Sequence, residues 1–430
     1  MSISLSDKQR AAIATIKDWY TNRTRQQQVC RVFGYAGVGK STIVKYAIEE
    51  LGLSADKPGE VLYAAFTGKA ALVMTRKGTQ ASTIHSLVYR VSEATPQEIE
   101  KLEKEAADIR AGLHALGMAE RLFEETRLRS LELRLKDAHK PRFVLNAESA
   151  VRDCKLLVLD EVSMVGTDMA QDLLAFGKPT LVLGDPGQLP PVKGEGAFDT
   201  PTPDVLLTEV HRQAGESAVL RLATLARQGQ WIPYGHHDDF VWKMRRSDVG
   251  PDQLLKADQV ICGRNATRIQ LNVAMKRAAG FDAIFPAGIG EKLICLKNRN
   301  DVGLVNGMFV TLDDIKDDGD EIAFTASITS EDGKKIGGGA NGKSERFKIW
   351  RGPFLDHVSP DPDRERREYQ KKRTSVECVW GWAITCHKSQ GSSWPNIVIY
   401  DDGLGRTAED RARWLYTAIT RAERGLVLLD

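Results

Sequence analysis

One short segment constrains the fold most tightly: residues 34–41 read G-x-x-x-x-G-K-S. The apolar, strand-like run VCRVF precedes it, and TIVKYAIEEL, which has helical periodicity, follows. In that context the glycines let consecutive backbone N–H groups face phosphate oxygens at a helix N-terminus, rather than merely forming a turn. Lys40 then reaches the β and γ phosphates, and Ser41 supplies a magnesium ligand. The nucleotide-binding residues that this segment predicts are Gly34, Gly37, Gly39, Lys40, Ser41 and Thr42.

A second motif supplies the carboxylates that the first requires. The apolar run KLLVL ends in Asp160 and Glu161. At the end of a strand, Asp160 can hold magnesium while Glu161 orients and deprotonates an attacking water. Alone, such a pair of acidic residues is as compatible with a surface turn as with a catalytic site. Together with the phosphate loop it predicts hydrolysis of ATP with Mg²⁺, and Ser41 and Asp160 are the expected metal ligands.

The spacing of apolar runs predicts an α/β fold. Short apolar stretches bounded by glycine recur without polar alternation, as expected for strands covered by helices on both faces. They fall before about residue 185 and after about residue 258. We therefore expect two α/β lobes.

Two stretches interrupt this pattern. Residues 95–98 (TPQE) form a capping box with proline at the first helical position, and apolar residues then recur every three or four positions to Leu135. This predicts a helical hairpin with a solvated face. Residues 289–375 contain short strand-like runs separated by Asn-Gly and Asp-Gly pairs, which predict β-hairpins and a small β-barrel.

Composition limits the number of domains, the kinds of site and the cellular compartment that we expect. The chain has 430 residues, enough for two to four domains, and its 60 basic against 58 acidic residues give a net charge of +2. Six scattered cysteines indicate neither a disulfide framework nor a zinc site. The first ten residues are polar and no apolar run of 18 residues occurs, so we expect a cytoplasmic protein without a leader or a membrane span.

Eight motifs, in this order, resemble those of superfamily 1 helicases, and most closely the RecD-like, Dda-type branch of superfamily 1B. They are residues 5–9 (LSDKQ), 66–71 (FTGKAA), 82–86 (STIHS), 160–164 (DEVSM), 184–192 (GDPGQLPPV), 211–213 (HRQ), 385–391 (TCHKSQG) and 416–422 (YTAITRA).

The resemblance implies two RecA-like, doubly wound parallel-sheet lobes with an insertion in each. The domains would be 1A (1–85 and 147–215), a helical 1B pin or wedge (86–146), 2A (216–288 and 376–430) and an SH3-like 2B (289–375). The 1B segment is longer and more helical than the β-hairpin of the Dda-type enzymes. We expect no appended nuclease or partner domain.

The same resemblance assigns further roles at the nucleotide. Gln9 is the expected adenine reader, the alternative being a surface glutamine at a helix start. Gln188 is expected to sense the γ phosphate, and Gly391 joins the nucleotide site. Arg212 and Arg421 are candidate arginine fingers, although lone arginines more often form surface ion pairs. Lys40 and Glu161 complete the catalytic set.

For the nucleic-acid track, polar residues of the motifs are expected to contact the phosphate backbone without reading sequence. Three tryptophans, Trp380, Trp382 and Trp394, flank the motif at residues 385–391. For these side chains we favour packing in the core over stacking on bases. The basic run at residues 364–373 is a solvated helix or a phosphate-contacting or partner-contacting arm. The expected DNA contacts are Thr67, Lys69, Thr83, His85, Thr385, His387 and Lys388.

The resulting hypothesis is an ATP-dependent DNA helicase that moves 5′ to 3′ on single-stranded DNA. Its expected partners are single-stranded DNA, duplex junctions and replication or recombination proteins, and we expect a monomer. The alternatives are a single-strand-stimulated ATPase that remodels protein–DNA complexes, and a small-molecule P-loop kinase, which would not need Glu161. We also expect a locally positive groove between Lys69, His85 and Lys388.

Overall fold

A computed structural model describes residues 5–92, 95–138, 142–191, 194, 196–209, 217–281, 288–316, 319–337, 346–357 and 359–430. It divides into two compact units, one made of Met1–Ile84 and Asp153–Asp430 and the other of His85–Arg152. Over these described ranges, the helices are all too short or too polar to cross a bilayer.

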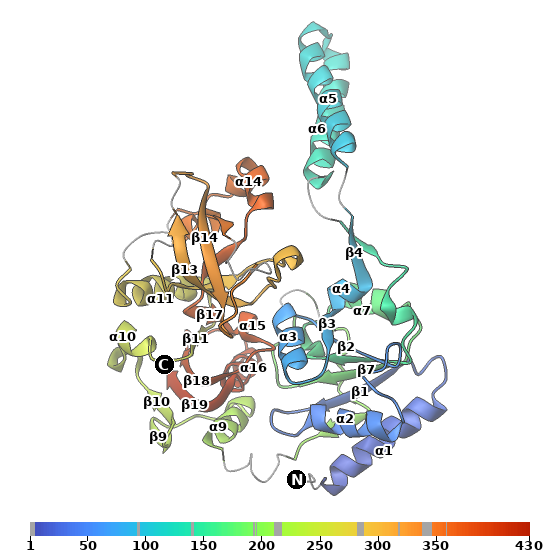
Figure 1. The fold of residues 1–430 in the computed structure, drawn as a ribbon, viewed down its shortest axis with the longest axis vertical. Coiled ribbons are helices and arrows are strands. Elements are labelled where there is room, and N and C mark those ends of the chain that lie inside the picture. The colour runs from blue at the N-terminus through green and yellow to red at the C-terminus, as the bar shows by residue number, and fades with distance from the viewer. Residues whose placement is uncertain are drawn as a thin grey trace. The chain divides into compact units, whose positions relative to one another are not determined.

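The first lobe of the larger unit is built on six parallel strands in the order β3-β2-β6-β7-β1-β8 (Figure 1). Every residue of the strand Thr180–Gly184 is buried, as expected when helices cover both faces. The α/β prediction is therefore confirmed here. The elements are α1 (Asp7–Asn22), β1 (Val29–Gly34), α2 (Lys40–Glu50), β2 (Val61–Ala65), α3 (Gly68–Arg76), β3 (Ala81–Thr83), β6 (Leu156–Asp160), α7 (Thr167–Leu174), β7 (Thr180–Gly184) and β8 (Val205–Leu207).

The second lobe has its own six-stranded sheet, ordered β17-β11-β18-β19-β10-β9. Only the edge strand β9 runs antiparallel to its neighbour. Two sheets, rather than one large one, confirm the prediction of two lobes. The elements are α9 (Ala218–Arg227), β9 (Gly235–Asp238), β10 (Val241–Met244), α10 (Pro251–Leu254), β11 (Gln259–Cys262), α11 (Asn265–Ala278), β17 (Ala383–Thr385), α15 (Cys386–Ser389), β18 (Trp394–Tyr400), α16 (Ala408–Ile419) and β19 (Ala422–Leu429).

A five-stranded antiparallel sheet interrupts the second lobe, in the order β15-β14-β13-β12-β16. The predicted strands near residues 292–296, 308–312 and 321–328 are present in it. Its last strand lies beyond residue 375. The elements are β12 (Lys292–Cys295), β13 (Phe309–Lys316), β14 (Ala323–Ser330), β15 (Phe347–Trp350), α12 (Gly352–Leu355), α13 (Arg364–Arg367), α14 (Tyr369–Thr374) and β16 (Cys378–Trp380).

A buried ion pair fixes this sheet to the second lobe. Lys276 on α11 lies 2.6 Å from the Glu291 carboxylate, and Trp380 donates its indole N–H to the same group at 3.1 Å. The Glu291 side chain is fully buried. Burial lowers the pKa of Lys276, and the bond to Glu291 opposes that shift. Each charge therefore depends on the other to remain in the interior.

The tryptophans and the basic run serve the structure. Trp380 and Trp394 are buried, and Trp382 packs against two hydrophobic cores, so core packing is confirmed for all three. In the basic run, cations pair with acids of the same part of the chain, including Arg367 with Asp361 and Lys371 with Asp320. This pairing accounts for much of that run's charge.

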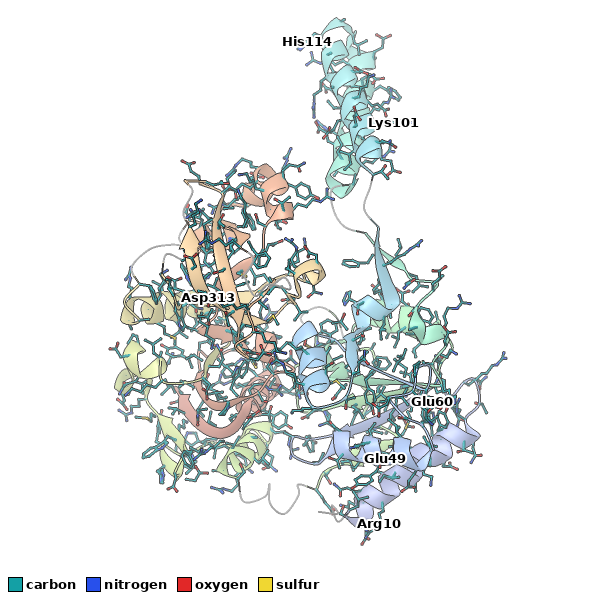
Figure 2. The ribbon with its side chains drawn as sticks, viewed as in Figure 1. Arg10, Glu49, Glu60, Lys101, His114 and Asp313 are labelled. Carbon is teal, nitrogen blue, oxygen red and sulfur yellow. The ribbon has the colours of Figure 1, made fainter. Side chains whose placement is uncertain are left out.

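The smaller unit is a helical hairpin on a two-stranded ribbon. Thr95 and Glu98 form the predicted capping box at the start of α5, and α5 and α6 are held together by the pairs Arg110–Glu132 and Arg127–Glu105, each at 2.6 Å. The helical hairpin is thus confirmed, and Figure 2 labels Lys101 and His114 on it. The elements are α4 (Ile84–Val88), β4 (Tyr89–Ser92), α5 (Pro96–Gly112), α6 (Met118–Ala138) and β5 (Arg142–Leu145).

Removing one partner of the buried ion pair should be costly. We expect Glu291→Ala to lower the free energy of unfolding by about 3–5 kcal/mol, because it leaves the Lys276 ammonium buried without its partner. Urea unfolding followed by tryptophan fluorescence measures this. As a control, Glu50→Ala breaks the exposed pair with Lys17 and should cost less than about 1 kcal/mol. Equal losses in the two variants would contradict this account.

Candidate functional site

The phosphate loop lies between β1 and α2, as the sequence predicts. Gly37 and Gly39 have φ values of 80° and 82°, which residues with side chains rarely adopt. At Gly34 an added Cβ would lie 2.8 Å from Val38 and 2.9 Å from Leu207, so only glycine fits. The Lys40 ammonium donates to the Gly34 carbonyl at 2.6 Å, which places its charge over the loop.

The paired carboxylates lie at the end of β6. Burial, and next the neighbouring Glu161 carboxylate, raise the pKa of Asp160 to about 6, while Lys40 opposes the shift. Glu161 adopts a φ of 54°, the one positive value at a non-glycine residue in the described part of the chain. Its backbone N–H donates to the Asp160 carboxylate at 2.8 Å. The turn therefore directs two adjacent carboxylates differently at the carboxyl edge of the sheet.

A cavity of about 760 Å³ runs between the two lobes at this edge. Its wall also includes Glu49 of α2, which is labelled in Figure 2. The cavity is large enough for a nucleotide. The predicted site residues that line it are Ser41, Thr42, Asp160, Glu161, Gly391 and Arg421.

Arg421 reaches the cavity from the second lobe. It is buried, and its guanidinium donates to the carbonyls of Thr417 and Ser392 at 3.0 and 3.3 Å. One nitrogen lies 4.0 Å from the Glu161 carboxylate. The side chain is therefore fixed across the cavity from the first lobe, where a charge developing on phosphate could be neutralised.

The loop after β7 carries Gln188, which is buried. Among the described residues its amide oxygen finds no hydrogen-bond donor, although the atom is shielded from solvent. Buried acceptors are normally satisfied, so this oxygen is available to a donor other than those of the described residues.

Sequence reasoning missed Tyr416 as a site residue, although its motif was identified. The Tyr416 hydroxyl donates to the buried Asp185 carboxylate at 2.7 Å and accepts from the backbone N–H of Ala36 at 2.8 Å. On the next residue, the Thr417 hydroxyl accepts from the Leu189 N–H at 3.0 Å. The start of the 416–422 motif thus joins the second lobe to the phosphate loop and to the Gln188 loop.

Gln9 lies beside the phosphate loop. Its amide nitrogen donates to the Val38 carbonyl at 3.3 Å, and its amide oxygen accepts from the Ser6 N–H at 3.0 Å in a capping box. Gln9 is buried, so it is not the surface glutamine of the alternative interpretation. It is not among the residues that line the cavity, and adenine reading stays a prediction.

The expected DNA-contacting residues of the larger unit lie on α3, β3, β17 and α15. Thr67 caps α3 by accepting from the Ala70 N–H at 3.1 Å, and Gly391 of the second lobe packs against this cap. Lys69 is buried and ion-paired. Burial lowers the pKa of His387. Thr83 ends β3, Thr385 ends β17, and His387 and Lys388 lie on α15.

Two of the predicted site residues, His85 and Arg212, are not among the described residues of the larger unit. His85 belongs to the smaller unit, where its ring lies 5.7 Å from that of Tyr89 and 5.8 Å from that of Phe143. Burial lowers its pKa. The predicted groove between Lys69, His85 and Lys388 spans both units and stays a prediction. Arg212 falls within residues 210–216, outside the described part of the chain.

The residues at the cavity fit a magnesium ion held mainly by substrate. The described residues contain no cluster of three or more His, Cys, Asp or Glu side chains that could hold a metal. Ser41 and the half-buried Asp160 supply oxygen atoms at one wall instead. Mg²⁺ is commonly bound by one or two protein groups together with phosphates.

Comparisons with known proteins agree with this geometry. Residues 4–238 match the family model described as AAA domain, and residues 381–429 match the UvrD-like helicase C-terminal domain. Over 103 residues the chain is 32% identical to the ATP-dependent RecD2 DNA helicase of Deinococcus radiodurans, covering 23% of this chain and 14% of that protein. The chain therefore matches only a small part of that relative's length.

Solved structures share the fold. A structure of two coordinating Pif1 helicases at forked duplex DNA gives a TM-score of 0.52 at 18% identity, covering 99% of this chain and 92% of that one. The Pif1 helicase from Bacteroides in complex with ADP-AlF3 and single-stranded DNA gives 0.50 at 17% identity, with coverages of 99% and 92%. The Pif1 helicase from Candida albicans gives 0.50 at 18% identity, with coverages of 100% and 95%.

Removing the Tyr416 hydroxyl should slow ATP hydrolysis while preserving the fold. We expect Tyr416→Phe to keep its ring packing but lower ATP turnover about ten-fold or more, because hydrogen bonds to charged groups contribute about 1.5–3 kcal/mol. A phosphate-release assay measures this. The control is Tyr234→Phe, which removes a hydroxyl that donates to Asp430 at 2.5 Å on an exposed part of the second lobe. Unchanged turnover in Tyr416→Phe would refute the role of this bridge.

Proposed function

We propose that this chain, which belongs to the AAA-domain family, is an ATP-driven DNA helicase of superfamily 1B, similar to the RecD and Pif1 helicases. In this proposal it hydrolyses ATP to ADP and phosphate, moves 5′ to 3′ along single-stranded DNA and unwinds duplex DNA.

The observation that carries the proposal is the shared cavity. Ser41 and Glu161 line it from the first lobe, and Arg421 lines it from the second. A site built from two lobes couples occupancy to their separation, because a triphosphate attracts cations from both sides. A kinase for a small molecule needs no such arrangement.

The proposed chemistry follows from the side chains. Glu161 accepts the proton of the attacking water as the water approaches the γ phosphate. Lys40 and Arg421 neutralise the charge that develops on the phosphoryl group, one from each lobe. Ser41 and Asp160 would hold Mg²⁺, which would supply positive charge to the phosphates. Gln188 offers its unsatisfied amide oxygen to the water or to a neighbouring donor.

Movement along DNA then follows from lobe closure. When ATP binds, the cations on both lobes draw toward the phosphates, and after phosphate release the attraction falls. In this proposal, Tyr416 and Gln188 couple the change in lobe separation to α3 in the first lobe and to α15 in the second. Those elements carry Lys69 and Lys388.

The domain assignments belong to this proposal. Residues 1–85 with 147–215 form 1A, 86–146 form the 1B wedge, 216–288 with 376–430 form 2A, and 289–375 form an SH3-like 2B. The proposed partners are single-stranded DNA and duplex junctions. A Pif1 structure in complex with single-stranded DNA, and another that concerns DNA unwinding at forked duplex DNA, support this choice.

Two substitutions test the hydrolysis. We expect Lys40→Ala and Glu161→Gln each to reduce DNA-stimulated ATP turnover by about a hundred-fold or more, because each removes a group needed in the transition state. Binding of single-stranded DNA should remain. The controls Lys17→Ala and Glu409→Gln change exposed side chains of the same kinds and should keep full turnover. Wild-type rates in Lys40→Ala would disprove the assignment.

Matched tailed duplexes test direction and substrate. With ATP, a DNA duplex with a 5′ single-stranded tail should be unwound, and one with a 3′ tail should not. RNA duplexes of the same sequences identify the preferred nucleic acid. If DNA stimulates ATP hydrolysis but neither duplex is unwound, the remodelling ATPase is favoured. If the rate of ATP hydrolysis does not change when DNA is added, the kinase is favoured.

A further inference from the structure

Two cations of α3, Lys69 and Arg76, are already paired with carboxylates from the inserted antiparallel sheet. The Lys69 ammonium pairs with the Glu331 carboxylate. Arg76, in the last turn of α3, lies 3.3 Å from Glu331 and 2.9 Å from Asp332. Both acids are more than 250 residues away along the sequence. We call Glu331 and Asp332 the acidic turn.

The acidic turn is a well-defined structure at the end of β14. The Gly333 N–H donates to the Ser330 carbonyl at 2.9 Å, and the Ser330 N–H donates to the Lys334 carbonyl at 2.9 Å. The Ser330 hydroxyl donates to the Asp332 carboxylate, and this bond is the main reason why the pKa of Asp332 is lowered. The turn therefore holds the Asp332 carboxylate, in its ionised form, in a fixed position.

A second contact from the same sheet encloses Lys69. An added Cβ on Gly68 would lie 2.9 Å from the Val305 Cβ, so the loop before β13 is packed directly on the start of α3. The Phe309 ring centre lies 5.3 Å from the Lys69 ammonium. Lys69 is only 6% exposed as a result.

This enclosure makes Lys69 depend on an anion. Burial lowers its pKa, and the bond to Glu331 opposes that change. A buried cation that loses its partner is strongly destabilised. If the acidic turn withdraws, another anion must replace it or solvent must enter. The Glu331 carboxylate and a DNA phosphate offer the same thing to Lys69 and Arg76: negatively charged oxygen atoms that accept hydrogen bonds.

We propose that Lys69 and Arg76 form one phosphate-binding site for single-stranded DNA, and that the acidic turn occupies it as an internal competitor until DNA displaces it. This inference rests on the proposed function, because it needs DNA to pass over α3. It adds Arg76 to the DNA-binding residues and assigns the inserted sheet a role in limiting affinity.

Neutralising the acidic turn tests the proposal. The variant Glu331→Gln/Asp332→Asn keeps the shape and the turn's hydrogen-bond acceptors but removes both charges. Its dissociation constant for fluorescent oligo(dT), measured by anisotropy without nucleotide, should fall about ten-fold relative to wild type. Its affinity should also depend more steeply on salt, because the displaced carboxylates of wild type take up counterions that offset those released from the DNA.

Three controls separate competition from other effects. Glu321→Gln/Asp252→Asn removes two exposed acids elsewhere on the chain and corrects for net charge. In a Lys69→Ala/Arg76→Ala background, neutralising the acidic turn should give no gain in affinity. Asp332→Asn alone, which keeps the Lys69–Glu331 pair, should give a gain of about three-fold even if the double variant folds poorly.

The outcomes are distinct. An acidic-turn variant no tighter than the charge control, or a gain that persists without Lys69 and Arg76, overturns this inference while leaving the helicase proposal intact. Wild type that neither binds single-stranded DNA nor shows DNA-stimulated hydrolysis overturns the proposed function, and the absence of binding by every variant overturns both. A gain that requires both cations supports the inference.

Discussion

The buried hydroxyl of Tyr416 joins the two lobes at the point on which the nucleotide site depends most directly. It contacts the Ala36 N–H in the phosphate loop and the Asp185 carboxylate before Gln188. Burial raises the pKa of Asp185. Because few solvent molecules compete with these bonds, they are stronger and more directional than surface contacts. Arg421 follows only five residues later, so its distance from Glu161 is set by the same anchor.

The other constraint is the backbone conformation of Glu161. Its φ of 54° is unfavourable for a residue with a side chain and is typically retained where function requires it. The bond from its N–H to Asp160 compensates in part. This turn lets adjacent carboxylates serve different purposes: Asp160 lies half-buried near Lys40 of the phosphate loop, and Glu161 faces Arg421. A regular strand would instead direct consecutive side chains to opposite faces of the sheet.

Local patterns in the sequence predicted the structural features that are determined by residues close together along the chain. The glycines of residues 34–39 predicted the phosphate loop, apolar runs predicted parallel strands, and three- and four-residue spacing predicted the helical hairpin. Long-range pairings were not predictable in this way. Tyr416 meets Asp185 across 231 residues, and Lys69 meets Glu331 across 262. Nothing in the periodicity of either segment specifies its partner, because such contacts arise only when separate domains pack together.

The near balance of charge in the chain fits the proposed helicase, which must release the DNA that it binds. Each phosphate held by a lysine or arginine adds to affinity through counterion release, so a track of free cations would bind tightly and let go slowly. Competition from carboxylates such as Glu331 and Asp332 reduces the difference in free energy between the bound and released states, because an anion replaces each departing phosphate. The two cations on the first lobe and the acids of the inserted sheet that pair with them illustrate this balance.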